Sequence, residues 1–109
     1  MAKTGTARVR VGSAKQGQPV QVRSLILHPM ETGLRKDPKT GEKIPAHYIQ
    51  KVKADYNGSR VFEADWSVAI SKNPYLSYYL NPGSGGTLKM TWEDNQGGTF
   101  TAEAEVKVG

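Results

Sequence analysis

Residues 88–108 read LKMTWEDNQGGTFTAEAEVKV, and this stretch decides the fold. Apolar and polar residues alternate on both sides of a turn-forming segment at 94–98, with Leu88, Met90 and Trp92 sharing one face of the first half. A period of two is typical of a β-strand that buries one face and exposes the other. The stretch therefore predicts an antiparallel β-hairpin.

The same alternation recurs toward the N-terminus, in short segments separated by turn formers. Twelve glycines and six prolines among 109 residues supply these turns and argue against a helical bundle. Asn57-Gly58 is a strong hairpin signal, because both positions of a type I′ turn need a positive φ that Asn and Gly tolerate. In all, we expect seven strands, near residues 7–11, 20–27, 48–56, 60–65, 75–80, 88–93 and 100–108.

Seven short alternating strands in a chain of this length predict an all-β fold, a two-sheet antiparallel sandwich of immunoglobulin-like type. The chain has no cysteine, so it lacks the Cys–Trp–Cys core of antibody domains, and the likeness is one of architecture. Its length is that of one domain, and we expect residues 1–109 to form a single domain. The alternation assigns four aromatic residues to the core: Phe62, Trp66, Trp92 and Phe100.

Composition excludes several kinds of chemistry. Without cysteine there is no disulfide, no thiolate zinc site and no cysteine nucleophile. No serine lies in a Gly-x-Ser-x-Gly turn, and the acidic residues fall at solvent-side positions of the expected strands. We assign no catalytic residue and do not expect an enzyme.

The two histidines, His28 and His47, flank a long loop and could converge at its base, with Glu31 or Asp37 as a third metal ligand. A loop histidine beside a proline is more often a hydrogen-bonded turn residue. We therefore expect no metal and no other cofactor.

The net charge of +5 is unevenly distributed. Residues 1–60 carry twelve Lys and Arg against four Asp and Glu, whereas residues 61–109 carry three against six. The basic residues are scattered at strand spacing, which is typical of a solvent-facing sheet and favours an acidic protein partner over nucleic acid. No apolar run is long enough to cross a membrane, and the N-terminus does not read as a secretory signal, so the chain alone would be placed in the cytoplasm.

Residues 28–47, HPMETGLRKDPKTGEKIPAH, break the alternation. The segment holds three prolines and two glycines, and Asp37 to Gly41 reads as a turn. Loops of this length in compact domains tend to be functional, although a variable surface hairpin is the alternative.

Two strands carry apolar residues on both faces. Leu25-Ile26-Leu27 is continuously apolar, and Tyr75, Tyr78 and Tyr79 send rings to both sides of one strand. Tyrosine is enriched in protein interfaces, so this pattern favours a surface that binds a partner. The alternative is that the tyrosines are partly packed beneath long loops. A stand-alone binding module for a small ligand or nucleic acid is the competing hypothesis.

Several strings of the sequence are similar to those of the SoxZ family, the smaller subunits of the SoxYZ sulfur-carrier complex. One string runs from His28 to Asp37 and is followed by Gly41 and Ile44-Pro45, and its part from His28 to Arg35 is the most specific. The others are Tyr56-Asn57-Gly58, Ile70 to Tyr75, Thr91 to Asp94 and Thr101-Ala102-Glu103. The resemblance covers the chain from Arg8 to Val108.

This resemblance implies an immunoglobulin-like subunit that pairs with SoxY, whose cysteine carries the sulfur intermediates. It implies a non-catalytic role in thiosulfate oxidation, helping to present the carrier arm to SoxAX, SoxB and sulfane dehydrogenase. It also implies a periplasmic location, reached by co-export with SoxY without a signal of its own. The expected partner contacts are Leu25, Leu27, His28, Pro29, Met30, Thr32, Gly33, Arg35, Tyr75 and Tyr78.

Overall fold

The computed structural model describes residues 4–108, and within them seven strands and no helix. The expected all-β class and the number of strands are confirmed. The strands are β1 (Ala7–Val11), β2 (Val20–Ile26), β3 (Ile49–Tyr56), β4 (Ser59–Asp65), β5 (Tyr75–Leu80), β6 (Gly86–Asp94) and β7 (Thr99–Val106). No helix in the described part of the chain is long and apolar enough to cross a membrane.

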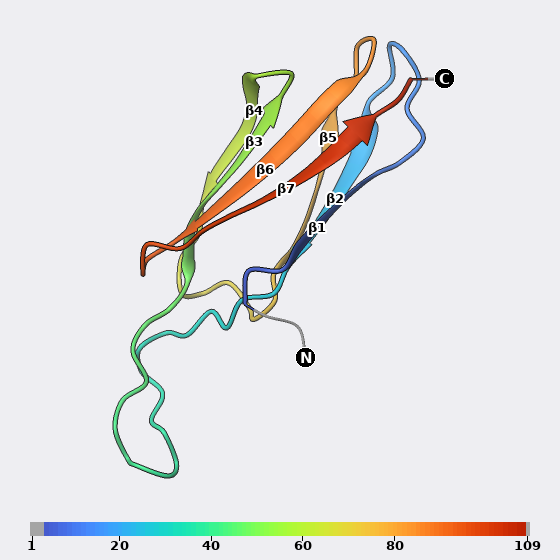
Figure 1. The fold of residues 1–109 in the computed structure, drawn as a ribbon. Coiled ribbons are helices and arrows are strands. Elements are labelled where there is room, and N and C mark those ends of the chain that lie inside the picture. Colours follow the sequence, from blue (N-terminus) through green and yellow to red (C-terminus); the bar gives the residue numbers. More distant parts are fainter. Residues whose placement is uncertain (1–3, 109) are drawn as a thin grey trace.

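The strands form two antiparallel sheets that pack as a sandwich (Figure 1). One sheet has three strands in the order β1-β2-β5, and the other has four in the order β4-β3-β6-β7. Side chains of β1 and β7 line a common groove, so these edge strands of the two sheets lie beside each other. The expected two-sheet antiparallel sandwich is confirmed.

The core follows the alternation of the sequence. Leu88, Met90 and Trp92 of β6 are fully buried, and Phe100 of β7 lies opposite Trp92 in the register of the hairpin. Phe100 is only partly buried, and the same holds for the other two aromatic residues assigned to the core, Phe62 and Trp66. These three rings pack against the margin of the core, because Phe62 and Phe100 lie on the outer strands of their sheet and Trp66 directly follows the outer strand β4.

The turn at Asn57-Gly58 has the predicted form. Both residues have positive φ, 53° and 82°, and they join β3 to β4. The side chain of Asn57 also accepts a hydrogen bond from the amide of Thr87 at 3.0 Å and donates one to the carbonyl of Gly85 at 3.2 Å. One turn residue therefore holds the neighbouring loop before β6.

The tyrosines of β5 divide between the two faces of their sheet. Tyr75 and Tyr79 point outward and are 60% and 70% exposed. Tyr78 points into the sandwich, where its ring stacks on Phe62 with a centroid distance of 4.9 Å. Burial raises the pKa of Tyr78 to about 12. Tyr78 therefore does not point outward as expected, because it lies on the same side of β5 as the buried residue Leu80.

Candidate partner-binding site

Residues 28–47 leave the end of β2 and return to β3 as an extension that projects from one end of the sandwich; we call it the arm (Figure 1). Its two halves are joined near the base by hydrogen bonds between Glu31 and His47, with amide-to-carbonyl distances of 2.7 and 3.0 Å. Farther out, the amide of Ile44 donates to the carbonyl of Arg35 at 2.8 Å. The long loop is therefore an ordered, irregular hairpin.

The tip of the arm has the turn that its sequence predicts. The amide of Gly41 donates to the carbonyl of Asp37, and the carboxylate of Asp37 accepts from the amide of Lys39, both at 2.8 Å. Gly41 has a φ of 74°, which glycine adopts without strain.

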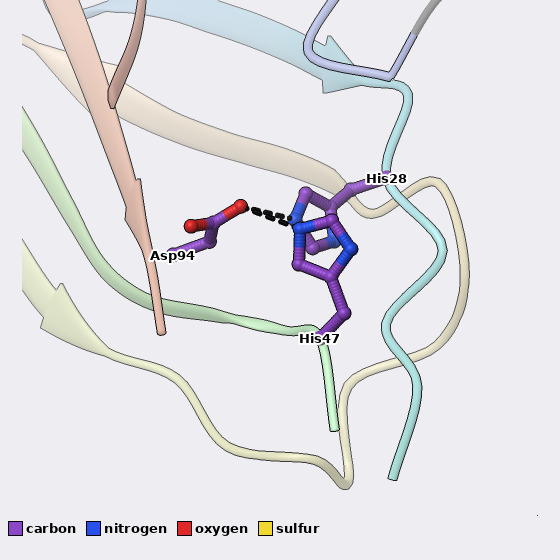
Figure 2. Close-up of side chains that lie close together, drawn as sticks. All are labelled: His28, His47 and Asp94. Carbon is purple, nitrogen blue, oxygen red and sulfur yellow. Dashed lines mark hydrogen bonds and ion pairs between the residues drawn. The ribbon is translucent and has the colours of Figure 1, made fainter. Parts of the chain in front are cut away.

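Three side chains meet where the arm joins the sandwich: His28 at its start, His47 at its end and Asp94 at the end of β6 (Figure 2). Each imidazole donates from Nε2 to Asp94 Oδ2, at 3.1 Å from His28 and 2.7 Å from His47. We call this cluster the arm-base triad. His28 and Asp94 are buried, so the triad fixes both ends of the arm to the turn between β6 and β7.

The carboxylate of Asp94 is fully engaged. Its Oδ1 accepts hydrogen bonds from the amides of Gln96 at 3.0 Å and Gly98 at 2.7 Å. Burial by itself would raise the pKa of Asp94, but the hydrogen bonds from the two imidazoles and two amides outweigh it and lower that pKa to about 2. Asp94 is therefore ionised at neutral pH.

The backbone determines the tautomer of His28. Its Nδ1 accepts the amide hydrogen of Met30 at 3.2 Å, so the ring proton lies on Nε2, where it is donated to Asp94. Burial lowers the pKa of His28 and outweighs its hydrogen bond to Asp94. His28 is thus a neutral donor at neutral pH.

The triad must also be considered as a metal site, because its three candidate ligand atoms lie within 4.8 Å of one another. The histidines converge at the base of the loop as expected, but the carboxylate is that of Asp94 and not of Glu31 or Asp37. A metal-bound histidine ligates through an unprotonated nitrogen and usually donates the hydrogen of the other. In His28 the other nitrogen is an acceptor, so the geometry favours a hydrogen-bonded cluster over a metal site.

The backbone of His28 is held by the connector between β4 and β5. The amide of His28 donates to Asn73 Oδ1, and the amide of Asn73 donates to the carbonyl of His28, both at 3.0 Å. Asn73 has a φ of 51°, a conformation that Asn tolerates better than most residues. The string around Asn73 thus has a structural role at the start of the arm.

The arm is buried only near its start, and most of its outer part is exposed. Met30 is buried, and its sulfur accepts the amide hydrogen of Ile49 at 3.3 Å. Gly33 has a φ of 85° and packs closely against Ala46. Arg35 forms a bidentate ion pair with Glu31, in which Nε donates to Oε1 at 3.1 Å and Nη2 donates to Oε2 at 2.6 Å. The hydrogen bond from Arg35 lowers the pKa of the Glu31 carboxyl.

The structure divides the expected partner contacts into two groups. Those that reach the surface, fully or partly, are Leu25, Leu27, Pro29, Thr32, Gly33, Arg35, Tyr75 and Tyr78. Tyr78 is half-buried, and its ring is turned into the sandwich. His28 and Met30 are buried and do not reach a surface of the free chain. These two bind the arm to the sandwich instead.

Asp94 is the residue that sequence reasoning missed. The acidic residues were expected on the solvent side of strands, yet Asp94 is only 4% exposed. The available signal was its place at the start of Asp-Asn-Gln-Gly-Gly, where an aspartate accepts the amide hydrogens of its own turn. That signal predicts the two amide contacts and says nothing of the two histidines.

A protein-family model described as "Sulphur oxidation protein SoxZ" matches residues 8–105 of the chain. A sequence comparison with curated proteins finds no significant match.

The fold is similar to that of several solved structures. Superoxide reductase (neelaredoxin) from Ignicoccus hospitalis superposes with a TM-score of 0.73 at 21% identity, covering 97% of this chain and 82% of that one. Superoxide reductase from Nanoarchaeum equitans gives 0.66 at 15% identity, covering 94% and 93%. A hypothetical protein from Pyrococcus horikoshii gives 0.62 at 14% identity, covering 97% and 90%. At these identities the likeness is one of fold alone.

Proposed function

Because the chain belongs to the SoxZ family of sulfur oxidation proteins, we propose that it is the non-catalytic subunit of a SoxYZ sulfur-carrier complex. In this proposal SoxY supplies the cysteine that bears the sulfur intermediates of thiosulfate oxidation. The chain described here pairs with SoxY and helps to present the carrier arm of SoxY to SoxAX, SoxB and sulfane dehydrogenase. The complex acts in the periplasm, where the chain arrives together with SoxY.

The observation that carries the proposal is the family match over residues 8–105, and the composition agrees with it. A carrier that holds sulfur as a covalent adduct needs a thiolate, and this chain has no cysteine. In this proposal the thiol comes from SoxY. A subunit without a thiol contributes to such a carrier through binding and positioning.

The arm-base triad supports a structural role and not a catalytic one. A catalytic histidine and aspartate need a nucleophile or substrate within hydrogen-bond reach. Here both oxygens of Asp94 are engaged by protein donors, and both ring nitrogens of His28 are engaged by Asp94 and Met30. The triad holds the arm in place.

The arm supports a binding role because it combines order with exposure. It projects from the sandwich, its base is fixed by the triad, and it carries the exposed side chains of Leu34, 79% exposed, and Arg35. A pre-ordered segment loses less conformational entropy on binding than a flexible one. The string from His28 to Arg35 therefore builds an element suited to contact with other proteins.

Co-expression with SoxY tests the proposal. SoxY with an affinity tag should retain this chain through purification and gel filtration. Thiosulfate, the Sox enzymes and an added electron acceptor, which takes the two electrons released when the thiolate and thiosulfate join, should place adducts on the SoxY cysteine in the complex, as measured by intact mass. The mass of this chain should stay unchanged. Elution of the two chains apart, or thiosulfate conversion by this chain alone, would contradict the proposal.

A further inference from the structure

The outer face of the three-stranded sheet gathers arginines and tyrosines. Strand pairing places Arg8 opposite Leu25 and Arg10 opposite Arg23, and Leu25 is in turn opposite Tyr75. These side chains share one face because they occupy outward positions on adjacent strands. We call this surface the arginine–tyrosine face; it consists of Arg8, Arg10, Gln21, Arg23, Leu25, Tyr75, Ser77 and Tyr79.

On the opposite outer face, on the four-stranded sheet, the basic side chains of β3 and β4 are paired with carboxylates. Lys51 lies 3.6 Å from Glu63 and 3.4 Å from Asp65. Lys53 lies 2.6 Å from Glu93. Two further ion pairs join Arg60 to Asp55 and Glu63.

The arginine–tyrosine face has no such compensation. It contains no carboxylate, and within residues 4–108 none of Arg8, Arg10 and Arg23 forms an ion pair. Glu103 of β7 lines a groove with Arg8 and Arg10 but lies beyond ion-pair distance of both. The guanidinium of Arg23 donates to the side-chain oxygen of Gln21, at 3.3 and 3.4 Å, which leaves its charge in place. Three positive charges thus remain on one small surface.

Apolar groups lie among these charges. Leu25 is 38% exposed although its neighbour Ile26 is fully buried, and Tyr75 and Tyr79 are among the most exposed large hydrophobic side chains of the described residues. Leu25 and Tyr75 form, with the three arginines, the lining of a shallow hollow of about 310 Å³. Arginine and tyrosine are enriched among the residues that dominate binding energy in protein interfaces.

We propose that the arginine–tyrosine face docks an acidic protein surface, with carboxylates around an apolar group that fills the hollow. The inference rests on the proposed function in one respect: the occupant is the cysteine-bearing subunit. A second copy of the chain fits poorly, because two such faces in contact would bring six arginines together. A nucleic acid fits poorly as well, because three charges around exposed Leu25 and Tyr75 make a compact spot and not a track for a phosphate backbone.

The test measures the affinity of the full chain for the purified cysteine-bearing subunit by calorimetry, at about 50 mM and about 300 mM salt. The triple variant Arg8→Glu, Arg10→Glu, Arg23→Glu should bind about 100-fold more weakly than the wild type. Higher salt should no longer weaken its binding and should instead strengthen it slightly, because salt screens the repulsion between the introduced glutamates and the partner's carboxylates. Tyr75→Ala should weaken binding about tenfold without changing the salt dependence.

Charge reversals on the other sheet provide the matched control. Lys89→Glu changes an exposed cation of β6, and it should leave affinity within about twofold of the wild type. Melting curves check that every variant is folded, which we expect because all these side chains are exposed.

The outcomes separate this inference from the proposed function. If the wild type binds and the triple variant binds equally well, the docking face is overturned while the proposed function stands. If the wild type does not bind the subunit, both are overturned. Micromolar binding of a DNA duplex lost in the triple variant, or a dimer of this chain lost in Tyr75→Ala, would replace the acidic protein with a different occupant.

Discussion

His28 and Asp94 are 66 positions apart in the sequence, yet Nε2 of one lies 3.1 Å from Oδ2 of the other inside the protein. This contact joins the start of the arm to the turn between β6 and β7. Since Asp94 also receives the hydrogen of His47, one carboxylate fixes both ends of a twenty-residue segment. The position of the arm therefore depends on a residue outside the arm.

Asp94→Asn should lower the free energy of unfolding by about 1–3 kcal/mol, the usual range for a buried hydrogen-bonding group left without its partner. An amide in place of the carboxylate can still accept from Gln96 and Gly98, but its NH₂ meets the N–H of His28. His28 cannot change tautomer without setting its Nδ1–H against the amide of Met30. Urea unfolding followed by circular dichroism measures the loss, and Glu103→Gln, an exposed change on β7, should have almost no effect.

Acid should destabilise the protein in two steps, both of which arise from the triad. The pKa of His28 is lowered on folding, so the unfolded chain binds the proton more readily, and stability falls as the pH drops below the ordinary value of 6.5. Folding lowers the pKa of Asp94 from 3.8 to about 2. The ionised carboxylate therefore contributes fully to stability above pH 3.8, and this contribution is lost between pH 3.8 and about pH 2. Urea titrations across this range should show both steps. The step at lower pH should be missing in Asp94→Asn. If the free energies of unfolding of the wild type and this variant differed by the same amount at every pH, the assignment to Asp94 would be contradicted.

The isolated chain should not retain a transition metal. The proton of His28 lies on the nitrogen that faces Asp94, and metal binding there would require both its removal and the loss of the Met30 hydrogen bond. After incubation with zinc and dialysis to remove the unbound metal, elemental analysis should give far less than one zinc ion per chain. Zinc should not raise the Tm. One retained ion per chain that disappears in His47→Ala would show that the triad is a metal site.

Sequence periodicity predicts most of this fold because burial alternates with it. Leu88, Met90 and Trp92 lie where the period of two places them, and Asn57-Gly58 forms the turn that its chemistry requires. The contacts of Asp94 could not be predicted in this way. They depend on how the arm packs against a distant turn, and a turn-forming aspartate looks the same with or without histidines nearby.

The tyrosine strand shows a second limit of periodicity. Aromatic residues at successive positions satisfy either phase, so Tyr75-Leu76-Ser77-Tyr78-Tyr79 does not reveal which rings are buried. Pairing with β2 settles the phase, because Tyr78 lies opposite the fully buried Val22 and Tyr79 lies opposite Gln21.

Replacing Tyr78 by alanine should therefore lower stability, whereas the same change at Tyr79 should not. Tyr78→Ala removes a ring stacked on Phe62 inside the sandwich and should cost about 3 kcal/mol, the lower end for a buried aromatic residue. Tyr78→Phe keeps the ring and removes a buried hydroxyl that has no hydrogen-bond partner among the described residues, so Tm should stay level or rise. Tyr79→Ala, on the outer face, should leave Tm nearly unchanged. Thermal melting of the three variants decides the matter, and a neutral Tyr78→Ala would mean that the inward phase of β5 is incorrect.

Arg35→Ala should weaken binding to the cysteine-bearing subunit about tenfold while leaving Tm nearly unchanged. The Arg35 side chain is 63% exposed, and its contact within the chain is the surface ion pair with Glu31, a kind of pair that adds little to stability. The triad holds the arm independently of this pair, so its geometry should persist in the variant. Lys107→Ala, an exposed change near the end of the chain far from the arm, should alter neither binding nor melting. Calorimetry gives the affinity, and differential scanning fluorimetry gives Tm. Wild-type affinity in Arg35→Ala would exclude this side of the arm from the interface, whereas a large fall in Tm would show that Arg35 supports the arm and does not contact the partner.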